Sequence, residues 1–292
     1  MAGAYPDKNL SNVNSLRSVN RKQALVLTVF FAVTMTAFTF LDLPLEKRLY
    51  TGPNAFGETM KIAGILPTSL AGIFFGYAIA STGKLAKKPR LSSAVGLCAL
   101  ILFTSFNLLS VAMLNRRALL PAAAGCGLWI AVSGKIDRRI AARGDGEGLR
   151  KAAVIALCSI TAAVLGQTAV KLLFNRPRFC SLTDPDAEFR FWFCHYPVQA
   201  DSSFPSGHAS QAALSFLLLY LQYFDRRLRT KGWNIAFCAF ATVLTLGTML
   251  SRISLGDHYP TDVTAGCALT IGVMLTSHYL VEKSSRTRDG DN

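Results

Sequence analysis

The chain has 292 residues, of which 51% are hydrophobic and only 16% are charged, and its formal net charge is +14. Soluble domains carry about 25% charged residues, so this composition argues against an ordinary soluble globular domain. A basic chain can bind nucleic acid, but no run of basic and aromatic residues supports a nucleic-acid partner here.

Eight segments contain no Asp, Glu, Lys or Arg, and each is 17 to 23 residues long. A helix needs about 20 apolar residues to cross the core of a bilayer. Buried helices of a large soluble protein, the alternative, would show polar faces and shorter apolar stretches. The sequence therefore predicts an all-α fold, a polytopic transmembrane helical bundle with about eight spans: Ala24–Leu41, Ile62–Gly83, Ser92–Leu114, Ala118–Gly134, Ala152–Val170, Ser206–Phe224, Trp233–Leu250 and Val263–Val281.

The third and fourth of these segments leave two interpretations open. Residues 92–134 form either a tight hairpin that turns at Asn115–Arg117 or a re-entrant segment, because the second arm is short and contains Pro121. Both interpretations return the chain to the same side of the membrane, so the later topology does not depend on the choice.

The basic residues are distributed by loop. With eight spans and a cytoplasmic N-terminus, 21 of the 31 Lys and Arg fall in the inside segments. This is the positive-inside pattern, and it accounts for the net charge. We expect a cytoplasmic tail at 1–23, one membrane domain at 24–281 and a cytoplasmic tail at 282–292. The long polar start predicts that the first span is retained rather than cleaved as a signal peptide.

Two cysteines, Cys180 and Cys194, share the loop 175–205, which this topology places outside. Disulfides persist in such oxidising compartments, so we expect Cys180 and Cys194 to be bridged, with two free thiols as the alternative. No Cys/His spacing resembles a zinc site.

Three short blocks at span ends carry the chemistry. The last block is Ser251–Asp262, with the sequence SRISLGDHYPTD. His258 and Asp262 are four residues apart, which places them on one helical face. A carboxylate bonded to one imidazole nitrogen leaves the other nitrogen free to attack, and Arg252 could hold phosphate oxygens in a bidentate manner. The alternative is a loop histidine with a carboxylate near it by chance.

The middle block is Pro205-Ser206-Gly207-His208. Pro, Ser and Gly suit the start of a helix. Free N–H groups at such a start form an anion site, and His208 in the first turn could act as a general acid. An ordinary capped helix with an interfacial histidine is the alternative.

The first block is Lys171–Phe179, with the sequence KLLFNRPRF. It places Lys171, Arg176 and Arg178 at the end of the fifth span. A charged side chain at this depth of a membrane costs free energy, so it either serves a function or extends to the lipid headgroups. A basic span end at the lipid headgroups would look the same.

Together the blocks resemble the type 2 phosphatidic acid phosphatase superfamily, which also includes lipid phosphate phosphatases, glucose-6-phosphatase and soluble vanadium haloperoxidases. Its pattern is K-x6-R-P, P-S-G-H and S-R-x5-H-x3-D. The second and third blocks match in full. In the first, Lys171 and Arg178 match, but Phe179 stands in the Pro position, and Arg176-Pro177 offers a competing R-P pair.

The resemblance implies a six-helix phosphatase core, here with extra helices, and a motif core at 152–281. It implies that His258 is the nucleophile of a phosphohistidine mechanism, that Asp262 orients it, and that His208 protonates the leaving group. Lys171, Arg178, Ser206, Gly207 and Arg252 would bind phosphate, with Arg176 as the alternative to Arg178. No cofactor and no metal are implied.

The predicted function is a phosphatase of the plasma (inner) membrane, with its site on the outer or periplasmic face and both termini in the cytoplasm. By resemblance, the substrate is a lipid phosphate or diphosphate: phosphatidylglycerophosphate, undecaprenyl diphosphate, phosphatidic acid or lipid A. One alternative is a phosphotransferase that passes the phosphoryl group to another lipid or sugar. A transporter or scaffold that binds phosphate without turnover is a further alternative. The expected partners are the substrate and membrane lipids, and the sequence leaves the oligomeric state open.

Overall fold

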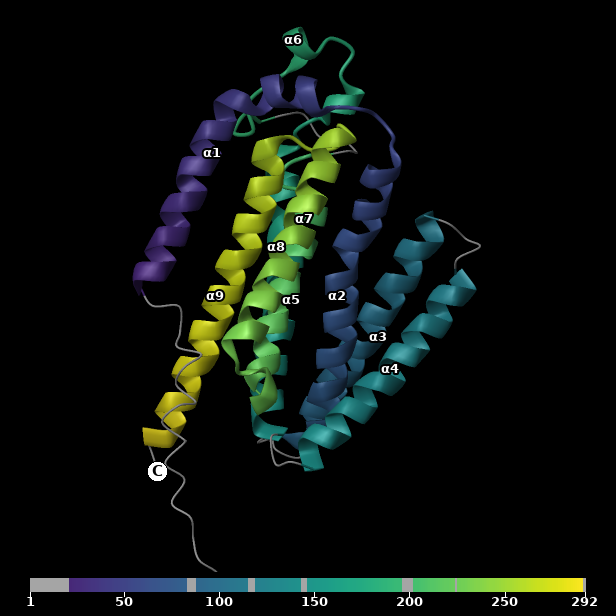
Figure 1. Ribbon diagram of the computed structural model, residues 1–292, viewed down its shortest axis with the longest axis vertical. Coiled ribbons are helices and arrows are strands. Elements are labelled where there is room, and N and C mark those ends of the chain that lie inside the picture. Colours follow the sequence, from purple (N-terminus) through teal and green to yellow (C-terminus); the bar gives the residue numbers. More distant parts are fainter. Residues whose placement is uncertain are drawn as a thin grey trace, which may run out of the picture.

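The computed structural model describes residues 21–82, 88–114, 119–142, 146–195, 202–223 and 225–290. This part of the chain is helical and contains no β-strand, which confirms the predicted all-α fold. The α-helices, shown in Figure 1, are α1 (Arg21–Leu49), α2 (Ala55–Ser81), α3 (Pro89–Leu114), α4 (Leu119–Ala142), α5 (Gly146–Phe174), α6 (Pro185–Glu188), α7 (Gly207–Ala213), α8 (Lys231–Ser254) and α9 (Pro260–Gly290). The described residues also form the 3-10 helices η4 (Phe179–Ser181), η5 (Leu214–Tyr223) and η6 (Arg226–Leu228).

Within the described residues, seven helices are long and apolar enough to cross a membrane: α1, α2, α3, α4, α5, α8 and α9. Most of the remaining predicted span, Ser206–Phe224, is also helical, because α7 continues directly into η5, which ends at Tyr223. Residues 92–114 and 119–134 lie in two long helices, α3 and α4, which agrees with the hairpin interpretation. The proposed turn at 115–117 and most of the predicted N-terminal tail lie outside the described residues, whereas α9 continues past the predicted span end to Gly290.

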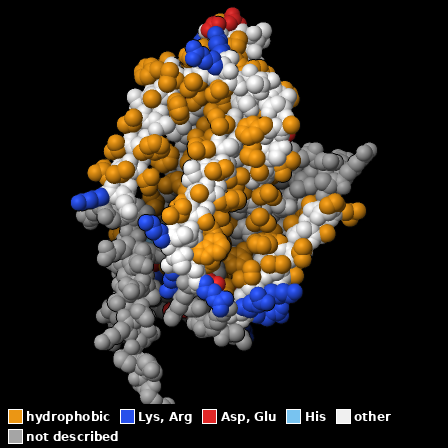
Figure 2. Space-filling view, in the orientation of Figure 1, with side chains coloured by type: hydrophobic (Ala, Val, Ile, Leu, Met, Phe, Trp, Pro, Cys, Tyr) orange, Lys and Arg blue, Asp and Glu red, His pale blue; other side chains and the backbone are white. Residues whose placement is uncertain are grey.

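The flank of the bundle is apolar. In the face seen in Figure 2, hydrophobic side chains cover the sides of the helices, and charged side chains gather toward the two ends. Large apolar side chains of α1, including Val29, Phe30 and Phe40, are more than half exposed. Exposed apolar surface of this extent marks a surface that faces lipid or a partner rather than water. The chain is therefore a multi-pass membrane protein.

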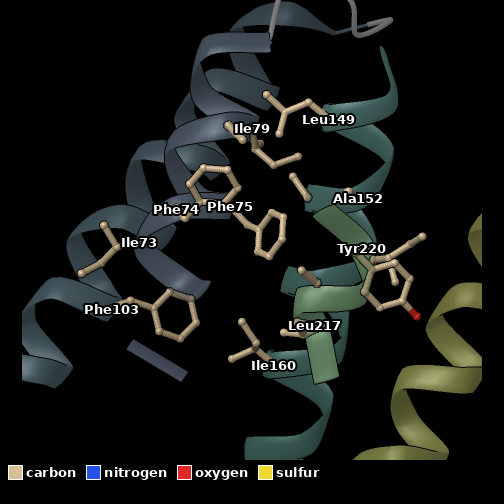
Figure 3. Packing of buried hydrophobic residues seen from close by; sticks show 14 of the residues in the cluster. Ile73, Phe74, Phe75, Ile79, Phe103, Leu149, Ala152, Ile160, Leu217 and Tyr220 are labelled. Carbon is tan, nitrogen blue, oxygen red and sulfur yellow. The ribbon is translucent and has the colours of Figure 1, made fainter. Parts of the chain in front are cut away.

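The core lies between α2, α5 and η5. Phe74 and Phe75 of α2 lie between the helices, facing Ile160 of α5 and Leu217 of η5 (Figure 3). These side chains are almost fully buried, so α2, α5 and η5 form the packed centre on which the other helices lie.

Small residues bring α3 against α2. A Cβ atom added at Gly96 of α3 would lie 2.3 Å from the backbone nitrogen of Ala80 in α2. Gly76 of α2 lies in the same contact, since a Cβ there would be 2.9 Å from the nitrogen of Leu100. Membrane helices approach this closely where glycine faces glycine, because no side chain separates the backbones.

One end of the bundle collects the ends of several helices. The helix α1 contains Pro44, and its ribbon bends over this end (Figure 1). Proline removes a helical hydrogen bond and is a common cause of such bends. The C-terminal ends of α5 and α8 and the first turns of α7 and α9 lie here as well, and backbone hydrogen bonds join them: Ser203 N to Arg176 O at 2.7 Å and Ser206 N to Asp262 O at 2.9 Å.

Candidate functional site

The last block forms the turn between α8 and α9. Arg252 lies in the final turn of α8, His258 lies in the turn itself, and Asp262 lies in the first turn of α9; all three are buried. Gly256 adopts φ +72°, a conformation that favours glycine. The amides of Asp257 and His258 donate to the carbonyl of Arg252, at 3.1 and 3.3 Å, so the turn folds back on the end of α8.

The orientation of His258 is set by the backbone. Its Nδ1 lies 2.7 Å from the carbonyl oxygen of Ser203. A carbonyl only accepts hydrogen bonds, so Nδ1 carries the proton and Nε2 keeps the lone pair. Burial lowers the pKa of His258 to about 4, although the carboxylate of Asp262 opposes that shift. His258 is therefore a neutral imidazole at physiological pH, with its lone pair on Nε2.

The expected direct bond between Asp262 and His258 is not formed. Asp262 Oδ2 lies 3.8 Å from His258 Nδ1, which is too long for a hydrogen bond. The carboxylate instead accepts from the amide of Tyr259 at 2.8 Å and from Arg176 Nη1 at 2.8 Å. Asp262 therefore caps the start of α9 and acts on His258 by charge alone, because the carbonyl of Ser203 occupies the position that the carboxylate was expected to take.

Arg176 lies in a closed network below the surface and is 1% exposed. Its guanidinium donates to Asp262 and, at 3.0 Å, to both Asp42 of α1 and Thr261, and it stacks on the ring of Tyr259 at 3.8 Å. These contacts occupy the donors with which Arg176 would hold a phosphate. The left-handed conformation of Asn175, φ 48°, ends α5 and directs the chain into this position.

Arg178, in contrast, lies beside Arg252. Its Nη1 donates to Asp257 Oδ1 at 2.7 Å, and Arg252 Nη2 donates to the other oxygen of the same carboxylate. Asp257 thus holds two guanidinium groups next to each other. Of the two arginines that competed for one role in the sequence, the geometry places Arg178, and not Arg176, at the site.

The middle block starts α7 as predicted. The hydroxyl of Ser206 caps the helix by accepting from the amide of Ala209 at 3.4 Å. His208 follows in the first turn and is within electrostatic range of Arg252, His258, Arg178 and Lys61. The first turn of α7 therefore brings a second histidine to the cationic end of α8.

Lys171 completes the cationic group from α5. Its Nζ donates to the carbonyl of Ser202 at 2.7 Å, and its charge acts on His258. Lys171, Arg178, His208, Arg252 and His258 thus come from all three blocks and meet at one end of the bundle. The three blocks that the sequence singled out form one site.

Arg252 has donors that remain open. Its Nε and Nη1 are buried and have no hydrogen-bond partner among the described residues. A buried guanidinium without acceptors is costly. An anion with several oxygens, such as a phosphate group, would supply the missing acceptors in the bidentate geometry that arginine favours.

The predicted disulfide is absent: Cys180 and Cys194 are not bridged in the structure. The reason is that the two cysteines pack against different parts of the site. The amide of Cys180 donates to the carbonyl of Gly256 at 3.0 Å, so η4 lies on the α8–α9 turn. Cys194 follows Trp192, whose ring stacks on Phe204 at 5.2 Å and whose Nε1 donates to Thr39 of α1.

Four residues of the site region were missed in the sequence: Asp42, Asp257, Lys61 and Ser203. Asp42 interrupts the end of an apolar run, and an acidic residue at membrane depth is itself a functional signal. Asp257 directly precedes His258. The sequence holds no signal for Ser203, because its backbone carbonyl makes the contact.

One comparison with known proteins gives a match. The model of the PAP2 superfamily matches residues 152–286, a region that contains all three blocks and extends from α5 into α9. Neither the curated proteins nor the solved structures give a significant match. The helices α1 to α4, with Asp42 and Lys61, lie outside the matched region. Residues 152–286 are thus similar to the PAP2 superfamily, and this similarity, together with the apolar helices, supports a membrane protein of the phosphatase type.

Proposed function

We propose that the protein is an integral-membrane lipid phosphate phosphatase that works through a phosphohistidine on His258. The observation that carries this proposal is the combination of a neutral, backbone-oriented His258 with the open, buried donors of Arg252 at the same end of the bundle. A nucleophile beside preorganised cations is what phosphoryl transfer requires, since the cations stabilise the charge that develops in the transition state.

The reaction then takes two steps. The lone pair of His258 Nε2 attacks phosphorus, the bond from phosphorus to the leaving oxygen breaks, and that oxygen takes a proton from His208. Water next attacks the phosphohistidine and gives a proton to His208, which releases inorganic phosphate and restores Nε2. Arg252, Arg178 and Lys171 hold the phosphoryl oxygens throughout, together with Ser206 and Gly207 at the start of α7.

A lipid substrate is supported by an apolar cavity of about 800 Å³ enclosed by α1, η5, α8 and α9. Ile253, Pro260 and Val263 line it, and these residues adjoin Arg252 and Asp262 in the chain. An apolar cavity that begins beside a cationic site suits a molecule with a phosphate head and hydrocarbon chains. Phosphatidylglycerophosphate, undecaprenyl diphosphate, phosphatidic acid and lipid A all have this character.

We also propose that the site faces the outer side of the plasma (inner) membrane and that both termini face the cytoplasm. The support is the excess of Lys and Arg in the segments at the opposite end of the bundle. A reporter fused at Thr230, before α8, should read cytoplasmic, and one fused at Asp186, in α6, should not. The reverse result would invert the proposed topology.

The deciding experiment measures phosphate release in detergent from a panel of these lipid phosphates. His258→Ala should abolish release, and the matched control His195→Ala should keep it, because His195 lies in an exposed loop, where its Nδ1 is 3.1 Å from the carbonyl oxygen of Leu173. Full activity of His258→Ala would refute the nucleophile. Analysis of products from a labelled donor, with and without an added acceptor lipid or sugar, separates hydrolysis from phosphotransfer.

A further inference from the structure

A second large cavity lies away from the catalytic end. It has a volume of about 740 Å³ and is enclosed by α2, α4, η5 and α8. Its wall is apolar over most of its length and includes Leu70 and Phe74 of α2, Leu217 of η5 and Phe240 of α8. The helix α4 closes one side, and Trp129 fixes α4 to α2 by donating from Nε1 to the carbonyl of Leu70 at 2.9 Å. The catalytic groups have no part in this cavity.

The mouth of this cavity is charged. Arg139, in the last turns of α4, and Arg227, in the connection between η5 and α8, both line it. Neither guanidinium forms a hydrogen bond or an ion pair with another described residue. Asp225 lines the same mouth, and its Oδ1 accepts from the backbone amide of Arg227 at 3.0 Å. Arg139, Arg227 and Asp225 therefore line one mouth.

The mouth opens at the end of the bundle opposite the site. The C-terminal ends of α2 and α4 and the connection between η5 and α8 meet there, and Figure 2 shows Lys and Arg side chains gathered at the lower end of α4. In a bilayer this end lies at the headgroup level of the leaflet opposite the site. A basic mouth above an apolar cavity between helices complements a lipid with a negative headgroup and hydrocarbon chains.

From this complementarity we propose that the cavity is a binding site for an anionic phospholipid of the leaflet opposite the active site. The phosphate of the lipid lies between Arg139 and Arg227, and one hydrocarbon chain enters the cavity between α2 and α4. The lipid is a bound structural component and is not a substrate, because no nucleophilic histidine lies at this end of the cavity among the described residues.

The test measures lipid binding to the purified full-length protein by native mass spectrometry. The probes are phosphatidylglycerol, which is anionic, and phosphatidylcholine, which is zwitterionic, with the same acyl chains. Phosphatidylglycerol should bind more tightly than phosphatidylcholine. Arg139→Gln and Arg227→Gln should each weaken the binding of phosphatidylglycerol about fivefold, since one cation near a membrane surface contributes about 1 kcal/mol to binding. Phosphatidylcholine binding should not change.

The matched control is Arg138→Gln. Arg138 is exposed and neighbours Arg139 in the chain, but it does not line the cavity. An equal loss in Arg138→Gln would mean that the surface attracts anionic lipid without a defined site, and this would overturn the proposal. Equal binding of the two lipids to the unaltered protein would overturn it as well.

A second pair of variants tests whether a hydrocarbon chain of the lipid enters the cavity. Ala71→Phe fills the cavity from α2, whereas Ala124→Phe adds the same ring to an exposed position of α4 outside it. Ala71→Phe should weaken the binding of both lipids, and Ala124→Phe should weaken the binding of neither. Unchanged binding in Ala71→Phe would show that no chain enters. Retained phosphate release in each variant shows that it is folded, so a binding loss is then assigned to the cavity.

Discussion

Arg176 and Asp42 form an ion pair, 3.0 Å from Nη2 to Oδ2, that is buried on both sides. Asp42 belongs to α1, outside the matched domain, and Arg176 also holds Asp262 inside it. The first helix therefore supports the turn that carries His258. The hydroxyl and the amide of Thr261 also donate to Asp42, so one carboxylate ties α1 both to the segment that follows α5 and to α9.

Asp42→Asn should destabilise the protein by about 3 kcal/mol, because it removes one partner of a buried charge pair. Thermal unfolding in detergent measures the loss. The control is Asp186→Asn, which breaks the exposed pair between Asp186 and Lys47 and should cost about 1 kcal/mol or less. Equal losses in the two variants would contradict a supporting role for the buried pair.

Arg178 and Arg176 should respond differently to substitution. Arg178→Gln should weaken inhibition by inorganic phosphate at least about tenfold and leave the melting temperature nearly unchanged, since a charge-assisted hydrogen bond contributes about 1.5–3 kcal/mol. Arg176→Gln should chiefly lower the melting temperature, because its contacts are internal. Inhibition assays and thermal unfolding on the same preparations separate the two roles. The opposite pattern would show that Arg176, and not Arg178, binds phosphate.

The pH dependence of kcat/KM reports the pKa values of the essential groups in the free enzyme. Burial lowers the pKa of His258 to about 4, so the imidazole is neutral and able to attack above that pH. We expect activity to rise with pH through an acid limb near pH 4 and to be insensitive to His258 titration at pH 6–7. The profile of His195→Ala should show the same limb. A limb near the ordinary histidine value, about 6.5, would mean that His258 is exposed to water.

Gly256→Ala should destabilise the α8–α9 turn by about 1–3 kcal/mol. The residue has φ +72°, and a Cβ there would lie 2.7 Å from the ring of Tyr50 and 3.0 Å from Cβ of Cys180. Gly127→Ala is the matched control, since no described residue beyond its own helical turn lies within 4 Å of its Cβ position in α4. That change should be neutral or stabilising by up to about 1 kcal/mol, because alanine favours a helix. A neutral Gly256→Ala in thermal unfolding would show that the turn tolerates the strain.

Most of the fold follows from apolar run length. A helix that crosses a bilayer must satisfy its own backbone hydrogen bonds and present apolar side chains to lipid, so each span leaves a long uncharged segment in the sequence. The PSGH and SRISLGDHYPTD blocks also carry their chemistry in local spacing. The all-α fold, the membrane character and the meeting of Arg252, His208 and His258 were predictable for these reasons.

Contacts between distant segments were not predictable. The choice between Arg176 and Arg178 depends on Asp42, 134 positions from Arg176 in the chain, and the orientation of His258 depends on the backbone carbonyl of Ser203, 55 positions away. The four-residue spacing of His258 and Asp262 indicated a hydrogen bond between them. The carboxylate of Asp262 is held instead by Arg176 and by the amide of Tyr259. The cysteine pattern failed for the same reason, because η4 and the aromatic segment pack on different neighbours. The sequence by itself determined which groups are present and at which end of the spans they lie. Tertiary packing decided which of them bond to one another, since buried polar groups take partners from whichever segments the fold brings close.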